Sequence, residues 1–513
     1  MDRPVRIGTG HFRFVLLLCF PMCLYAAEEP LVKVSTATPV VTSETRASST
    51  TPNNVGPTSP NRVLPGESVA HKNYWIPALE IPAFQFTLNQ FDRWAYGLKD
   101  YGSTWASGWD HVQHGPWVVD RDAFTVNQIG HPYQGTMYYG FARSSGLNFW
   151  EGWIYSNAGS FLWETYGELT DPSINDQVAS GTAGAIIGEP LYRMANLVLE
   201  GSDDQKPGFW RELGAAIISP PTGLNRFVFG DAYSPILESR RPATFVRLQA
   251  GGGKNNSVRD QASSIPVAHT VGTADFSMAY GLPGQPGYLY LRPFDYFDFE
   301  LNGLAERKST FENVMTRGLL FGNKYESRDD NARGVWGLYG SYDYLSPQVY
   351  RLSTTAASLG TTAQWWLSRT VALQGTGLGG IGYGAAGTIA PQGDERDYHY
   401  GAAPQGLLAL RLIFGQRAMF DATARGYYIT GLGANNAPGT EKISRINASF
   451  VLRLYGPHAL GVDYLLTTRD ANYASSGLGE RHQRIGTISL VYNYLSDFHF
   501  GAVEWGRNTK ESK

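Results

Sequence analysis

The chain has 513 residues, of which 59 are glycine, and its formal net charge is -3. This balanced charge excludes a strongly basic surface for nucleic acid, and the length predicts more than one structural unit. Abundant glycine and aromatic residues with only 17% charged residues are typical of a membrane β-barrel rather than of a soluble enzyme.

Residues 1–26 have the layout of a secretory signal peptide, with a basic start, an apolar stretch and a small-residue end. Both cysteines of the chain, Cys19 and Cys23, lie within it, so we expect neither disulfides nor thiolate chemistry in the secreted protein. Residues 27–71 are rich in Ser, Thr and Pro and cannot bury enough apolar surface to fold, which predicts a disordered linker.

Residues 72–240 are expected to form a helical unit rich in aromatic residues. Between 86 and 112 the aromatics recur at helical spacing, and such a stripe usually belongs to a core. A helix is predicted over 144–168, followed by a turn at Asp171 and a second helix that Pro190 should kink. The first of these helices carries polar groups at intervals of four residues, namely Ser156, Ser160, Glu164 and Glu168. A polar stripe on an otherwise apolar helix indicates burial in protein or lipid.

Residues 241–506 change to a period of two, with apolar and polar side chains alternating along segments of about ten residues. In 445–454, for example, one face is apolar and the other carries charged and polar side chains. These segments predict about 12 strands closed into a barrel, since only a closed barrel satisfies the backbone of a sheet in lipid. A soluble β-sandwich is the alternative, but the aromatic content and the long polar hairpins argue against it. Residues 507–513 form a charged tail.

Ordered motifs fill the stretch from Trp117 to Val198. They are Phe124-Thr-Val-Asn-Gln-Ile-Gly-His-Pro-Tyr-Gln-Gly135, Ala142-Arg143, Gly146-Leu-Asn-Phe-Trp-Glu151, Trp163-Glu164, Pro172-Ser-Ile-Asn-Asp176 and Gly188-Glu189. These motifs resemble an uncharacterised bacterial family, the domain of unknown function 3943. The resemblance implies a bacterial, envelope-resident protein, and it brings no assigned reaction and therefore no catalytic residues.

Charged groups that are costly to bury recur through the apolar helices, so they need partners or water. The expected partners of Glu164, Glu168 and Glu189 are two arginines, with Asp176 as a further acidic group. We predict a buried polar network that fixes how the helices pack, made of Arg143, Glu168, Asn175, Asp176, Glu189 and Arg193.

A sharper hypothesis places acyl transfer in the same stretch. His131 would be the general base, Ser160 or Ser156 the nucleophile, and Glu164 the group that orients the histidine. The sequence lacks the Gly-x-Ser-x-Gly motif of many serine hydrolases. Pro132 is expected to restrict His131 to extended geometry, which favours a structural role for the imidazole.

No metal site or other cofactor is predicted. Asp110, His111 and His114 have a ligand-like spacing, but a third strong ligand is missing from the sequence around them.

Together these features predict an α+β protein of the bacterial outer membrane, a helical unit followed by an antiparallel transmembrane β-barrel. We expect the helices to plug the lumen or to lie in the periplasm at the mouth of the barrel, where they would gate it or dock periplasmic partners. The alternative is a lipid-modifying hydrolase or acyltransferase that uses His131, Ser160 and Glu164. The expected partners are outer-membrane lipid and either a periplasmic protein or a small solute, with no nucleic acid.

Overall fold

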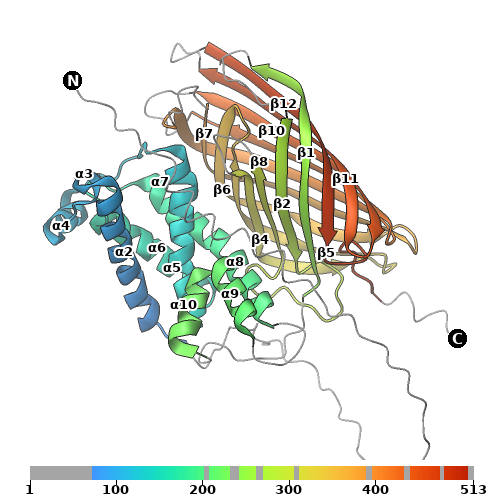
Figure 1. Ribbon diagram of the computed structural model, residues 1–513, viewed down its shortest axis with the longest axis horizontal. Coiled ribbons are helices and arrows are strands. Elements are labelled where there is room, and N and C mark those ends of the chain that lie inside the picture. Colours follow the sequence, from blue (N-terminus) through green and yellow to red (C-terminus); the bar gives the residue numbers. More distant parts are fainter. Residues whose placement is uncertain are drawn as a thin grey trace, which may run out of the picture.

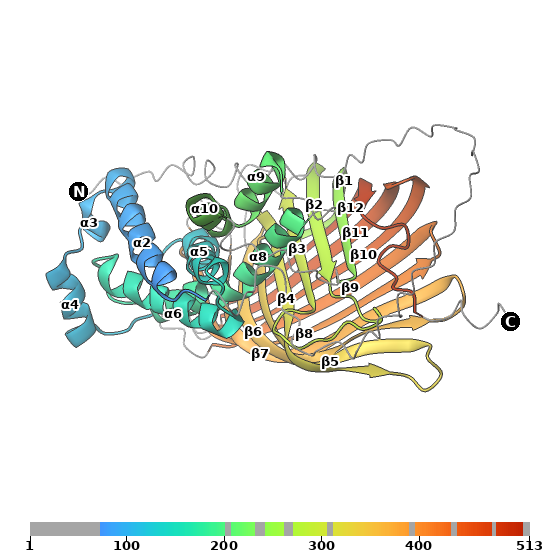
Figure 2. The same ribbon diagram turned by 90° about the horizontal axis from the view of Figure 1, so that it is seen from below.

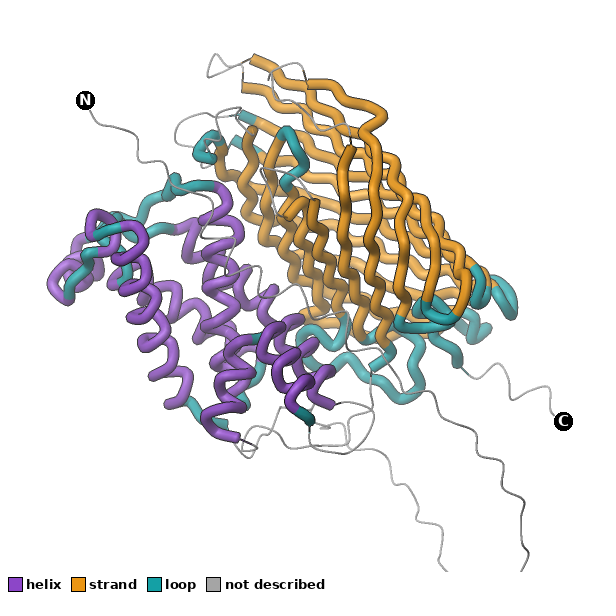
Figure 3. Tube along the Cα trace, viewed as in Figure 1, coloured by secondary structure: helices purple, strands orange, loops and turns teal. Residues whose placement is uncertain are grey.

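The computed structural model describes residues 72–200, 207–230, 242–260, 270–304, 311–388, 395–431, 439–473 and 479–505. The predicted signal peptide, linker and charged tail lie outside the described residues. Within them the chain forms a helical unit, residues 72–230, and a β-barrel that follows it (Figures 1 and 3).

The helical unit contains α2 (Trp75–Tyr96), α3 (Leu98–Tyr101), α4 (Trp105–His114), α5 (His131–Ser144), α6 (Phe149–Tyr166), α7 (Ile174–Asp176), α8 (Gly184–Glu200), α9 (Phe209–Ile218) and α10 (Pro220–Phe229), with the π-helical segments η2 (Val126–Gly130) and η3 (Gln177–Ala183) leading into α5 and α8. Helix α6 begins at Phe149, later than predicted. Gly146 takes a positive φ of 81° after α5, and Asn148 then caps α6 by accepting a hydrogen bond from the backbone N–H of Glu151.

The barrel is a closed sheet in which each strand pairs with its sequence neighbours and β12 pairs antiparallel with β1. Its strands are β1 (Thr244–Asp260), β2 (Thr270–Tyr280), β3 (Phe297–Leu304), β4 (Phe311–Glu326), β5 (Ala332–Leu345), β6 (Tyr350–Trp366), β7 (Val371–Thr388), β8 (Tyr398–Phe414), β9 (Ala418–Ile429), β10 (Thr440–Tyr455), β11 (His458–Tyr473) and β12 (Gly479–Leu495). The predicted fold class, helices followed by a 12-stranded antiparallel barrel, is confirmed.

The wall of the barrel turns apolar side chains outward and polar side chains to the lumen. On β10, Ile446 and Phe450 are exposed, whereas Arg445 and Ser449 are buried inside the barrel. Inward side chains form the ion pairs Arg247–Asp421, Arg411–Asp421, Arg317–Asp343, Arg425–Asp343, Arg445–Glu312 and Arg469–Glu441. They leave a cavity of ≈ 90 Å³ lined largely by polar groups. The lumen is therefore narrow and charged.

The mouth at which β1 begins is closed by residues 496–505, which fold back after β12. The side chain of Gln364 donates to the carbonyl of Val503 at 2.7 Å, and that of Gln374 donates to the carbonyl of Gly501 at 2.7 Å. The two glutamines are buried inside the barrel, so this segment covers its interior at that end.

The helical unit packs against the outer face of the barrel (Figures 1 and 2). On β5, Tyr342 lies on the same face of the strand as exposed Trp336. On β8, Tyr400 lies on the same face as exposed Leu408. Tyr342 donates to the carbonyl of Gln128, and the Gln128 side chain donates to Tyr400 Oη at 2.9 Å. The surface that receives the helices is therefore the outer wall.

Contacts between the helical unit and the barrel reach both rims of the wall. Arg193 of α8 pairs with Asp295 in the β2–β3 connection, with an N–O distance of 3.2 Å. The backbone N–H of Phe124 donates to the carbonyl of Glu395, in the β7–β8 connection at the opposite rim, at 3.1 Å. The expected position of the helices in the lumen or at a mouth is therefore wrong. Side chains of the barrel occupy the lumen, and outward aromatic residues of the wall provide the packing surface.

The aromatic stripe that was expected in the core is exposed along much of its length. Its exposed members are Phe86, Phe91, Trp94, Trp105 and Trp109. Helix α2 instead buries Gln85, Asn89 and Asp92. Periodicity identifies the two faces of a helix, but tertiary packing decides which face turns inward. Across the part of the chain that the structure describes, no helix is long and apolar enough to cross a membrane.

Candidate functional site

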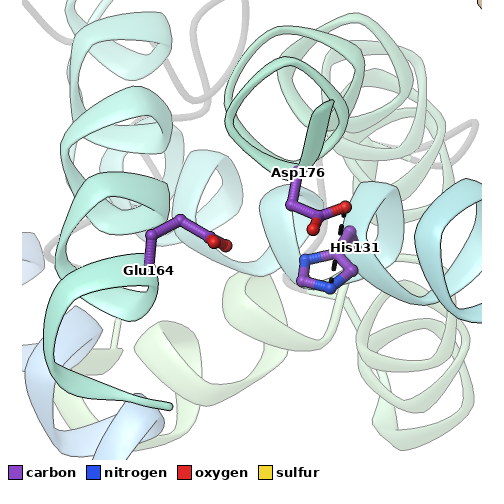
Figure 4. Close-up of side chains that lie close together, drawn as sticks. All are labelled: His131, Glu164 and Asp176. Carbon is purple, nitrogen blue, oxygen red and sulfur yellow. Dashed lines mark ion pairs between the residues drawn. The ribbon is translucent and has the colours of Figure 1, made fainter. Parts of the chain in front are cut away.

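Three side chains from separate helices meet inside the helical unit and point toward one another (Figure 4). They are His131 at the start of α5, Glu164 in α6 and Asp176 at the end of α7. One ligand-type atom from each lies within 4.8 Å of the others, and all three residues are buried. The sequence predicted that His131 and Glu164 share a site, and the structure brings them together.

Both π-helical segments adjoin this cluster. Segment η2 ends directly before His131, and η3 begins directly after Asp176. A π-helical turn changes the direction of the side chains that follow it and is frequent at functional sites. His131 itself is helical, with φ -60° and ψ -47°, so the prediction of extended geometry is wrong. Pro132 is tolerated because it occupies the first turn of α5, where Pro is common.

Each side chain of the cluster forms a hydrogen bond with a neighbouring residue through one of its polar atoms. The three contacts are Ser180 Oγ to His131 Nδ1 (3.1 Å), Ser173 N to Glu164 Oε2 (2.9 Å) and Asn175 Nδ2 to Asp176 Oδ1 (3.0 Å). Glu164 Oε1 is buried and has no hydrogen-bond partner among the described residues. His131 Nε2 lies 3.9 Å from Asp176 Oδ1. The remaining atoms of His131 and Glu164 therefore stay available to a ligand between the three side chains.

The cluster holds more buried acid than base. Burial, and then the neighbouring Asp176, raises the pKa of Glu164 well above its ordinary value. Burial, and then Asp120, raises the pKa of Asp176. Glu168 accepts a hydrogen bond from Trp163 Nε1 at 2.7 Å, and burial raises its pKa to about 7. No arginine or lysine of the described ranges forms an ion pair with these three carboxyl groups. Protons or a bound cation must therefore offset their charge.

Arg143 and Arg193 neutralise a different carboxylate, that of Glu189 in α8. The Nε atom of each arginine lies 2.7 Å from one oxygen of Glu189, and all three side chains are buried. Burial alone would raise the pKa of Glu189, but the two guanidinium groups lower it to about 2. The prediction that these arginines also pair with Glu164 and Glu168 is wrong. The predicted single network is thus two separate networks, and only one of them contains cations.

Both networks fall inside one family match. Residues 116–221 match the family model described as Domain of unknown function (DUF3943). This stretch is a DUF3943 domain. The family that the motifs predicted is confirmed. No curated protein matches the sequence.

Solved structures similar to this chain include outer-membrane channels. The outer membrane channel DcaP of Acinetobacter baumannii aligns with a TM-score of 0.23 and 9% identity, covering 49% of this chain and 95% of that chain. An outer membrane channel from Pseudomonas putida F1 aligns with a TM-score of 0.26 and 9% identity, covering 50% of this chain and 97% of that chain.

Within the DUF3943 domain, Ser160 does not contact His131. The Ser160 hydroxyl donates to the carbonyl of Asp176 at 3.3 Å. The serine beside the imidazole is Ser180 in η3, which sequence reasoning missed. The available signal was its position four residues after Asp176, since that spacing places two residues on one helical face.

The three polar residues before the DUF3943 domain do not gather into a metal site. His114 Nδ1 lies 3.0 Å from Asp110 Oδ1 on the surface of α4. His111 Nδ1 faces the carbonyl of Thr165 instead, at 3.0 Å. His111 and His114 therefore form local hydrogen bonds instead of sharing a ligand.

Proposed function

We propose that the DUF3943 domain of this outer-membrane β-barrel binds a divalent metal ion between His131, Glu164 and Asp176. The main support is the buried Oε1 atom of Glu164, which lies in this cluster without a hydrogen-bond partner in the described chain. An unpaired buried carboxylate is strongly disfavoured. A divalent cation would offset the charge of both carboxylates at once.

The chemistry of the three side chains favours zinc, manganese or ferrous iron. Imidazole nitrogen combined with carboxylate oxygen suits these metals, whereas calcium and magnesium prefer oxygen ligands alone. Three protein ligands leave coordination positions for water, as in catalytic zinc sites. A metal ion so bound would supply an activated water near neutral pH.

Groups that would orient the metal ligands are already in place. When His131 Nδ1 donates to Ser180 Oγ, the lone pair of Nε2 is directed into the cluster. Asn175 donates to Asp176 Oδ1 and also to Tyr400 Oη on the outer wall of the barrel, at 2.9 Å. The centre is thereby connected to the barrel, so we expect metal binding to strengthen the docking of the helical unit on the wall.

Metal analysis of the purified protein tests this proposal. The protein would be expressed with zinc, manganese and iron in the medium, extracted in detergent, and measured by inductively coupled plasma mass spectrometry. We expect about one ion per chain in the parent protein and a loss of at least tenfold in affinity in Glu164→Gln and Asp176→Asn, because each variant removes a charged ligand.

Glu151→Gln is the matched control for these variants. It makes the same chemical change as Glu164→Gln and in the same helix, α6, but Glu151 pairs with Lys72 outside the cluster at 2.9 Å. This variant should keep the metal. A parent protein that carries no metal and takes up none on titration, while correctly folded, would contradict the proposal.

A second candidate function is acyl hydrolysis of envelope lipid by a serine. The supporting observation is that the imidazole of His131 lies between a serine and a carboxylate, as in a catalytic triad. Ser180 Oγ lies 3.1 Å from His131 Nδ1, and His131 Nε2 lies 3.9 Å from Asp176 Oδ1. We expect Ser180→Ala to abolish lipid turnover while Ser160→Ala, the original candidate, retains it. Turnover that survives in both variants would exclude this second function.

A further inference from the structure

Helix α2 turns polar side chains inward and apolar side chains outward. It buries Gln85, whose amide donates to the carbonyl of Gly159, and Asn89, whose amide donates to the carbonyl of Gly167. Its opposite face exposes Trp75 to 78%. A helix that faces water shows the reverse arrangement, with polar residues outside. The surroundings of α2 are therefore apolar.

Neighbouring helices continue this surface. We use the term apolar face for a set of large exposed side chains on four helices. They are Trp75, Leu79, Phe86, Phe91 and Trp94 on α2, Ile154 and Phe161 on α6, Phe209 and Trp210 on α9, and Phe227 on α10. Phe227 is exposed to 89%. No charged side chain is exposed within the described residues 73–97, 148–170 and 207–230. An apolar area of this extent marks contact with lipid or with another protein.

Exposed charges of the helical unit gather at one end. They are Lys99, Asp100, Asp110, Arg121 and Asp171, among the residues that the structure describes between 72 and 230. Lys99 and Asp100 lie in α3 and Asp110 lies in α4. Arg121 follows α4, and Asp171 follows α6, whose end contacts α3 through the hydrogen bond from Leu169 N to Asp100 O. Elsewhere on the described part of the unit the charged side chains are at most partly exposed, for example Lys72, Glu151 and Glu212. This is the distribution expected when mainly one end meets water.

The apolar face is continuous with the outer wall of the barrel. Trp150 of α6 stacks on Phe321 of β4, with ring centroids 5.2 Å apart. The next two strands of the wall, β5 and β6, expose Trp336 and Leu359. The helical unit touches connections at both rims, and Figure 2 shows it alongside the strands. A lipid layer around this wall therefore also surrounds the helical unit.

We propose that the apolar face contacts the acyl chains of outer-membrane lipid, so that the helical unit lies in the lipid layer beside the barrel. The polar side chains of α2 that turn inward, Gln85 and Asn89, donate to carbonyls inside the unit, as polar groups must where no water is available. Exposed tryptophans suit the boundary between lipid and water, where amphipathic rings are common. The proposal does not depend on the metal centre, because His131, Glu164 and Asp176 are buried and none of them belongs to the apolar face.

Site-directed spin labelling of the full protein in lipid nanodiscs tests this placement. The two cysteines, Cys19 and Cys23, would be changed to serine, and single cysteines introduced at Phe86, Ile154 or Phe227. Accessibility of each nitroxide to oxygen, which partitions into lipid, is compared with accessibility to a water-soluble nickel chelate. Leu408 and Leu490 on the barrel wall serve as lipid standards, and Asp110 and Lys99 as water standards.

We expect the three test positions to behave like Leu408 and Leu490, with high access to oxygen and low access to the chelate. Chelate access equal to that of Asp110 would overturn the proposal. So would spin–spin broadening that disappears on dilution with unlabelled protein, because it would show that a second copy of the chain covers the face. Circular dichroism of each labelled protein confirms that the fold is retained.

Discussion

Glu164 and Glu189 are both buried glutamates in adjacent helices, but their surroundings give them opposite properties. Two guanidinium groups keep Glu189 ionised with a pKa of about 2, whereas burial and a neighbouring carboxyl raise the pKa of Glu164. One glutamate is therefore a fixed charge within an ion-pair network. The other must take up either a proton or a metal ion, and pH decides between them.

The stability of the metal-free protein should depend on pH in a defined direction. Burial raises the pKa of Glu168 from 4.5 to about 7, so the folded chain holds a proton there that the unfolded chain releases at lower pH. This contribution is complete below about pH 4.5 and disappears as the pH rises to about 7. We expect the melting temperature in a chelator to fall over this interval, and zinc to restore it above pH 7. Differential scanning fluorimetry measures both effects.

Glu168→Gln provides the control for that titration, because the amide cannot ionise. The slope of melting temperature against pH should become shallower in this variant. A chelated parent protein that becomes more stable between these two pH values would show that the carboxyl groups are ionised in the fold and would refute the prediction.

Arg143→Ala should destabilise the helical unit strongly. Arg143 is fully buried, and its Nε lies 2.7 Å from Glu189, so its loss leaves part of a buried carboxylate charge uncompensated. The expected cost is about 3–5 kcal/mol, as measured when one partner of a buried pair is removed. Chemical denaturation followed by tryptophan fluorescence gives the value. Arg226→Ala, which breaks a less buried pair with Glu212, should cost less; equal costs would contradict the argument.

At the residue scale, the sequence predicted which side chains are buried polar groups but not how they pair. Glu164 and His131 belong to one cluster as expected. The partners of Arg143 were assigned too broadly, because an arginine in an apolar helix can reach any of several acidic residues until the helix rotation is known. Ser180 was missed for the same reason.

At the scale of elements, a close approach between two helices supports the site. Gly135 of α5 and Gly184 of α8 lie against each other, and a Cβ on Gly135 would overlap the carbonyl oxygen of Ser180. The same segment, η3, presents the Ser180 hydroxyl to His131. The position of η3, and with it the orientation of the imidazole, therefore depends on the absence of a side chain at Gly135.

Gly135→Ala should separate α5 from η3 and loosen the metal centre. Forced separation of packed helices costs about 1–3 kcal/mol, and displacement of a group that orients a metal ligand lowers affinity about 10–100-fold. Thermal unfolding and metal titration measure the two effects. Gly214→Ala is the control, because its Cβ would meet only Val198 Cγ1 at an ordinary 3.4 Å and alanine favours a helix. If both variants bind metal equally well, the close approach is irrelevant to the site.

Elements were predictable where the pattern is local. The alternation within 445–454 lies in β10, and the expected strand number is confirmed. The orientation of α2 was not predictable, because an amphipathic helix presents the same period whether its apolar face meets a core or lipid. The polar stripe of α2 forms hydrogen bonds to carbonyls of α6 and its C-terminal turn, which only the tertiary structure shows.

At the scale of the whole molecule, the helical unit and the barrel are joined side by side, so the helices are not available to close the lumen. The lumen is narrowed by its own ion pairs, and residues 496–505 cover one mouth through Gln364 and Gln374. Any gate of the barrel should therefore depend on this C-terminal segment. The sequence did not indicate this, because the segment has no repeating pattern and its contacts are far away in the chain.

Planar-bilayer conductance separates a gate made by the helical unit from one made by the C-terminal segment. We expect the parent protein to be silent and to stay silent when residues 72–230 are deleted, because the helices lie against the outer wall and its rim connections rather than in the lumen. The double variant Gln364→Ala and Gln374→Ala should instead open transiently, since it removes the hydrogen bonds that hold Val503 and Gly501 over the mouth. Gln416→Ala at the exposed rim, where the amide contacts His499, is the matched control and should remain closed. Conductance that appears on deletion of the helical unit alone would show that it gates the barrel from outside the wall, and the assignment of the gate to residues 496–505 would then be wrong.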